Sequence, residues 1–72
     1  METVRIFYTT ENGRHIMKVK PRSLLLVNLY NLYKRQIEAH AHNANNNIVG
    51  RVWCDSSQYP AWHWYCEDDQ EA

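Results

Sequence analysis

Four histidines and two cysteines are the residues of this chain that could bind a metal ion. A structural zinc site usually takes its ligands from short, closely spaced pairs of cysteines and histidines. Cys54, His63 and Cys66 do not have this spacing. His40 and His42 are two residues apart in a predicted helix, so they point to different sides of it. We therefore expect no metal site and no cofactor, and we expect both cysteines to remain thiols rather than to form a disulfide.

The residue types used in catalysis are present, but without the spacing that catalysis needs. Ser56 and Ser57 fall in a predicted turn, and neither cysteine has a histidine placed by a recognisable motif. The acidic residues near the C-terminus lack the apolar surroundings that acid–base catalysis requires. With two glycines, the chain has no glycine-rich loop to hold a phosphate. We expect the protein not to be an enzyme.

Binding is the function that the residue types favour. One face of two predicted strands carries cationic, aromatic and aliphatic side chains: Arg5, Phe7, Ile16, Lys18 and Lys20. Exposed aromatic residues with arginine at their rim are typical of protein interfaces. The same mixture is typical of surfaces that stack single-stranded nucleic acids, but those surfaces usually carry a larger excess of positive charge. Eight basic residues balance eight acidic ones, so the bulk charge argues neither for nor against nucleic acid. Because the acidic end of the chain would compete with phosphate for these cations, we favour a protein partner and keep single-stranded nucleic acid as the alternative.

The first elements that position these residues are two strands of a predicted hairpin. Residues 3–9 and 15–20 alternate between apolar and polar, and Asn12-Gly13 between them indicates a two-residue type I′ turn. With this turn, Ile6 faces Val19 and Phe7 faces Lys18. The face opposite the binding residues is then the predicted core face: Val4, Ile6, Tyr8, Met17 and Val19.

Residues 23–42 predict one amphipathic helix. Its apolar side consists of Leu25, Leu26, Leu29, Tyr30, Leu32, Tyr33, Ile37 and His40, and His40 is expected to be a core histidine near the helix end. Ser23, which follows Pro21 closely, is the predicted N-cap. The asparagines within residues 43–47 are predicted to end the helix, because asparagine tolerates the left-handed conformation found beyond helix C-termini.

Two further strands are predicted, over residues 48–54 and 61–66, with turn residues at 55–60. In one register Trp53, Trp62 and Trp64 share a face; in the competing arrangement the tryptophans wrap the helix and leave no exposed patch. Gly50 is expected at a bulge or at a site of close packing. The order ββαββ predicts an α+β fold with a four-stranded antiparallel sheet and one helix packed across one face.

Seventy-two residues are enough for one small domain, which we expect to comprise residues 1–66. Residues 67–72 hold four of the eight acidic residues and are predicted to be a flexible acidic tail. The chain has neither an apolar run of about 20 residues, which a membrane span needs, nor a signal-peptide pattern. We therefore expect a cytoplasmic protein with no membrane contact, and the sequence leaves its oligomeric state open.

In overall organisation the chain resembles the small regulators that phages use to take over their hosts. The features that carry this resemblance are a short reading frame, taken to be complete, one hairpin–helix–hairpin unit, no catalytic signature and an acidic end. It is most similar in kind to the proteins that bind bacterial RNA polymerase and inhibit or redirect transcription, and small anti-CRISPR inhibitors are alike in style. The resemblance implies a stoichiometric inhibitor or modulator of a host complex in the host cytoplasm. No residue motif carries it, so no site residue is transferred.

Overall fold

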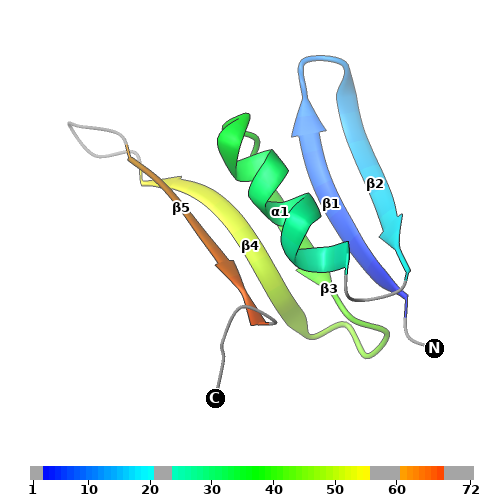
Figure 1. Cartoon of the computed structure of the whole chain (residues 1–72). Coiled ribbons are helices and arrows are strands. Elements are labelled where there is room, and N and C mark those ends of the chain that lie inside the picture. The colour runs from blue at the N-terminus through cyan, green and yellow to red at the C-terminus, as the bar shows by residue number, and fades with distance from the viewer. Residues whose placement is uncertain (1–2, 21–23, 56–60, 68–72) are drawn as a thin grey trace.

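The computed structural model describes residues 3–20, 24–55 and 61–67, which form one helix and one antiparallel sheet (Figure 1). The elements in chain order are β1 (Val4–Thr10), β2 (Gly13–Val19), α1 (Leu25–Lys34), β3 (Ala39–His42), β4 (Ile48–Asp55) and β5 (Ala61–Cys66). The strands lie in the order β2-β1-β3-β4-β5. The predicted α+β class, with a helix and an antiparallel sheet, is confirmed. The predicted four strands in ββαββ order are wrong, because a fifth strand follows the helix.

That fifth strand, β3, comes from residues that the sequence analysis assigns to the helix. α1 ends at Lys34, and Gln36 takes a left-handed φ of 57°. The Gln36 N–H donates to the Tyr33 carbonyl oxygen at 3.0 Å. The Ile37 N–H donates to the Leu32 carbonyl oxygen, also at 3.0 Å. These two bonds form a Schellman motif, which frees the following residues to become a strand.

The asparagine-rich segment 43–47 forms the loop between β3 and β4 instead of ending the helix. The Asn43 side-chain oxygen accepts the N–H of Asn45 at 2.9 Å and that of Asn47 at 3.0 Å. Asn46 has a φ of 65°. The left-handed conformation expected of this segment is therefore present, but it serves a hairpin loop.

β1 and β2 pair in a register that differs by two residues from the predicted one. Ile6 pairs with Met17 and Phe7 pairs with Ile16, each two positions before the partner predicted for it. Gly13 has a φ of +118°, and the two turn residues before it have no positive φ, so the turn is not of type I′. Because side chains alternate with a period of two, a shift of two residues leaves every side chain on its predicted face.

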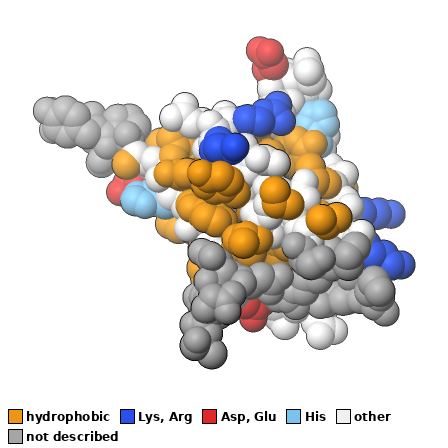
Figure 2. All heavy atoms as spheres, viewed as in Figure 1, with side chains coloured by type: hydrophobic (Ala, Val, Ile, Leu, Met, Phe, Trp, Pro, Cys, Tyr) orange, Lys and Arg blue, Asp and Glu red, His pale blue; other side chains and the backbone are white. Residues whose placement is uncertain are grey.

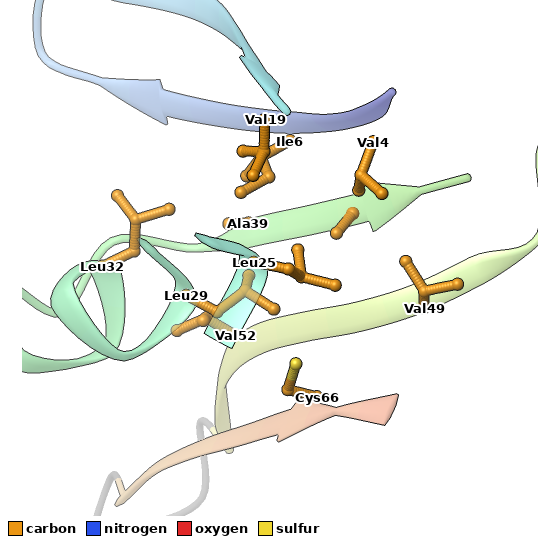
Figure 3. Close-up of a cluster of buried hydrophobic side chains, with 11 residues drawn as sticks. Val4, Ile6, Val19, Leu25, Leu29, Leu32, Ala39, Val49, Val52 and Cys66 are labelled. Carbon is orange, nitrogen blue, oxygen red and sulfur yellow. The ribbon is translucent and has the colours of Figure 1, made fainter. Parts of the chain in front are cut away.

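The core lies between α1 and the sheet, as Figure 3 shows for its buried side chains. It consists of Val4, Ile6, Val19, Leu25, Leu29, Leu32, Ala39, Ala41, Val49, Val52 and Cys66. A Cβ atom added at Gly50 would collide with Cδ1 of Leu29 and lie 3.4 Å from the Cβ atom of Ala41. The close packing expected at Gly50 is thus confirmed: small residues in β3 and β4 let α1 approach the sheet.

α1 is a crossover connection that covers only one face of the sheet. β1 runs antiparallel to both of its neighbours, so β2 and β3 are parallel, and parallel strands need such a connection. The helix lies in front of the sheet in Figure 1. None of the helices in the described residues is long and apolar enough to cross a membrane.

Three of the predictions fall largely outside the described residues. These are the helix cap at Ser23 after Pro21, most of the turn at residues 55–60, and the acidic tail. Of the predicted tail the structure describes Glu67 alone, which is exposed directly after β5.

Candidate binding surface on the sheet

The face of the sheet opposite α1 is covered by none of the described elements. Side chains alternate between the two faces along a strand, so the strand registers define which residues this face carries. We call it the open face. It consists of Arg5, Phe7, Thr9, Arg14, Ile16, Lys18, His40, His42, Ile48, Arg51, Trp53, Asp55, Ala61, His63 and Tyr65.

The structure brings four of the five predicted binding residues together on this face. Arg5 pairs with Lys18, and Phe7 pairs with Ile16. The Ile16 side chain is 60% exposed, although it is aliphatic. Lys20 is also exposed but follows the end of β2. The hairpin thus presents two cations beside an aromatic and an aliphatic side chain.

β3 adds two histidines to the open face. His42 pairs with Arg5, and its ring centroid lies 5.3 Å from that of Phe7. His40 pairs with Phe7 and is exposed, so the expectation of a core histidine on a helix is wrong. The Arg5 guanidinium Nη2 donates to the Asn46 side-chain oxygen at 2.9 Å, which fixes this cation over the β3–β4 loop.

β4 and β5 contribute a cluster that the sequence analysis did not place in the site. The Arg51 guanidinium lies over the Trp53 ring, 4.8 Å from its centroid. The His63 ring stacks on Trp53 with centroids 5.4 Å apart and planes inclined by 28°. Tyr65 faces Arg51 across the two strands and is 38% exposed. The alternation of residues 51–53 with the buried Val52 is the sequence signal that could have identified this cluster.

The other two tryptophans lie on the helix side of the sheet. Trp64 pairs with the buried Val52, and its ring centroid lies 5.5 Å from that of Tyr30 and 6.0 Å from that of Tyr33. Trp62 is also partly buried against the core. The predicted register in which all three tryptophans share a face is therefore wrong. The competing arrangement, in which tryptophans wrap the helix, holds for two of the three.

One row of directly facing residues crosses all five strands of the open face: Ile16, Phe7, His40, Arg51 and Tyr65. Neighbouring strands are about 4.8 Å apart, so the row extends over roughly 19 Å. A second row, on three strands, places Lys18 and Arg5 beside His42. The row residues and their neighbours thus interleave rings with cations over the whole width of the sheet.

Positive charge predominates on this surface even though the whole chain has a formal net charge of zero. Its cations are Arg5, Arg14, Lys18 and Arg51. Its acidic residues are Asp55, which faces Ala61 at the end of β4, and Glu38, which precedes β3 and lines one pocket with Phe7 and Arg14. The face therefore carries more cations than acidic side chains, although the whole chain is balanced.

The described residues contain no group of three histidine, cysteine or acidic side chains that could hold a metal ion. Cys54 and Cys66 are thiols, and both lie on the helix side of the sheet, away from the open face. No protein-family model matches the chain, and neither the curated proteins nor the solved structures yield a match.

Proposed function

We propose that the protein is a small non-enzymatic binding module whose open face holds single-stranded nucleic acid. The observation that carries this proposal is a row of rings and one cation, Phe7, His40, Arg51 and Tyr65, that crosses four neighbouring strands, with Trp53 against Arg51. Exposed sheets with such rings bind single strands by stacking unpaired bases on the aromatic side chains. Nearby cations contact the phosphates and release their counterions.

The excess of cations on the open face supports a polyanionic ligand. Four cations lie there beside two acidic residues, Glu38 and Asp55. On the N-terminal hairpin alone we favour a protein partner, because a single-strand surface usually has more excess positive charge. Arg51 adds a further cation to the open face, and Trp53 and Tyr65 add further aromatic rings.

A protein partner on the same face is the second candidate function, and one specific observation favours it. Ile16 and Ile48 are 60% and 56% exposed. Exposed aliphatic side chains bury apolar surface when they contact a protein, whereas they make no favourable contact with phosphate. This candidate includes a phage-type regulator that binds a host complex such as RNA polymerase, which is the class of protein that the chain resembles in its organisation.

Titration of fluorescent oligonucleotides at low salt tests the first proposal. We expect the anisotropy to rise with single-stranded DNA or RNA and to rise less with a duplex, because paired bases cannot stack on the rings. If four cations contact phosphates, the logarithm of the binding constant should fall against the logarithm of salt concentration with a slope of about 3. Absence of binding at low salt would contradict the proposal.

The same titration distinguishes the two candidates when it is combined with affinity purification from the natural host cell. Two results together would support the protein-binding candidate. The wild type would bind no oligonucleotide, and it would retain a protein partner that the double variant Phe7→Ala/Lys18→Ala does not retain. Native circular dichroism of the double variant is the required control.

A further inference from the structure

The two edges of the sheet differ in how they are protected against pairing with another strand. Alternate residues of an edge strand direct their N–H and C=O groups away from the sheet, where another strand can bind them. β2 carries Arg14 and Lys18, and charged side chains are a common protection of such edges. β5, at the other edge, has the sequence AWHWYC and contains no lysine, arginine, acidic residue or proline. Among the described strands, none lies beyond it.

Aromatic side chains lie next to this unprotected edge on the helix side. Tyr30 is 43% exposed, Tyr33 and Trp64 are partly buried, and the three rings contact one another at centroid distances between 5.5 and 6.1 Å. We call Tyr30, Tyr33, Trp62 and Trp64 the aromatic flank. Figure 2 shows hydrophobic side chains gathered on this side of the molecule. The flank is thus only partly covered by the chain that carries it.

We propose that β5 pairs antiparallel with β5 of a second copy of this chain, so that the two sheets join into one. In a two-fold arrangement both copies use the same strand, β5, at the junction. The helix sides of the two sheets then form one face of the joint sheet, and the two open faces form the other. Both helices then lie on one side, with the Trp62 and Trp64 rings of the two copies next to each other at the junction. Both open faces lie on the other side.

The composition of β5 is the reason for choosing a second copy as the partner. In an antiparallel pair of identical strands only the residue on the two-fold axis faces its own copy, and every other residue faces a different position. The charged residues of β2, Arg14 and Lys18, are both cations, so their approach to those of a second copy would destabilise self-pairing, whereas β5 has no such charge. Contact between two aromatic flanks would also bury apolar surface, of which a chain this small buries little by itself.

The molar mass in solution, measured by sedimentation equilibrium over a range of concentrations up to millimolar, tests this inference. We expect a mass of twice the 8.6 kDa of one chain at high concentration and dissociation on dilution. His63→Lys places an ammonium group on the exposed face of β5, near its counterpart, and should weaken dimerisation severalfold. Ile16→Lys adds the same charge to β2 and is the matched control, with the dimer retained.

Hydrogen exchange of the wild type gives a second readout that does not depend on any variant. At high concentration the outward-directed amides of β5 should exchange slowly, and dilution should make them exchange rapidly. The outward-directed amides of β2 should exchange rapidly throughout. A mass of 8.6 kDa at every concentration would overturn the inference, and so would a dimer that Ile16→Lys disrupts while His63→Lys does not.

Discussion

The guanidinium carbon of Arg51 lies over the Trp53 ring, 4.8 Å from its centroid, on the side of the sheet away from α1. Such a cation–π contact holds a long, flexible side chain in one place while its N–H groups remain available to other acceptors. The same indole ring also stacks with His63. The nucleic-acid strand that we propose as ligand would meet a cation and an aromatic cluster at this point of the open face.

Replacing the two members of this pair should have different effects on oligonucleotide binding. Arg51→Ala should weaken binding and lower the salt slope by about 1, because one phosphate contact is lost. Trp53→Ala should weaken binding by about 1–3 kcal/mol and leave the slope unchanged, since it removes stacking. Anisotropy titrations at several salt concentrations measure both quantities.

Lys34→Ala is the matched control for these variants. Lys34 Nζ lies 5.0 Å from the Tyr30 ring centroid, so it makes the same type of contact on the other side of the protein. Its removal should leave affinity within measurement error. An equal loss with Lys34→Ala would mean that overall charge, rather than the open face, governs binding.

Substitutions at neighbouring positions of β1 should separate binding from folding. Phe7→Ala should reduce binding and leave circular dichroism and the melting temperature nearly native, because the side chain lies on the open face. Ile6→Ala should lower the free energy of unfolding by about 2–5 kcal/mol, because Ile6 is fully buried. Urea denaturation of both variants checks this; a large loss of stability in Phe7→Ala would show that the face is core.

Gly50→Ala should destabilise the fold by about 1–3 kcal/mol, because the added methyl group collides with Leu29 at a tightly packed position. Combining it with Leu29→Ala should cost less than the sum of the two single effects, since the second change makes room for the methyl group. A double-mutant cycle in urea measures the difference. Additive effects would contradict the contact.

Gln36→Gly should raise the free energy of unfolding by about 1 kcal/mol. Gln36 has a φ of 57°, which is costly for a side chain with a Cβ atom and costs glycine nothing. Thermal denaturation checks the sign. Gln36→Ala is the control and should bring no gain, because alanine keeps the Cβ atom.

Neutralising the acidic end of the chain should strengthen binding to polyanions. Asp68→Asn, Asp69→Asn and Glu71→Gln together remove three of the eight acidic residues. Affinity for oligonucleotides at low salt should rise, because fewer carboxylates compete with phosphate for the cations. The gain should vanish at high salt, where charges separated by more than about 3 Å are screened. Unchanged affinity would mean that these carboxylates do not compete for the open face.

The N-terminal half of the open face could be predicted because face assignment does not change when the register shifts by an even number of residues. The turn beside Gly13 differs from the predicted one, yet Arg5 and Phe7 keep their face because the error is an even number of residues. An odd error would have buried them. The alternation of side chains between the two faces of this hairpin, rather than the turn type, determined the result.

The second half could not be predicted because residues 39–42 read equally well as helix. Ala39 and Ala41 favour a helix by intrinsic propensity, and their burial under α1 in β3 overrides that preference. The helix also ends at Lys34, and no glycine marks the left-handed position beyond it, which is occupied by Gln36. Without β3 the partners of β4 are undefined, so the position of Trp53 relative to the other tryptophans could not follow from the sequence.

The position of β3 also bears on how the chain reaches its native state. The β1–β2 and β4–β5 pairs each join strands that follow one another in the sequence. The β1–β2 hairpin and the β4–β5 pair become one sheet only when β3 lies between β1 and β4. Pairing β1 with β3 closes a loop that contains β2 and α1, which costs more entropy than a hairpin. The rate of folding should therefore respond to substitutions at Ala41, in the middle of the sheet, more than to substitutions in either outer strand.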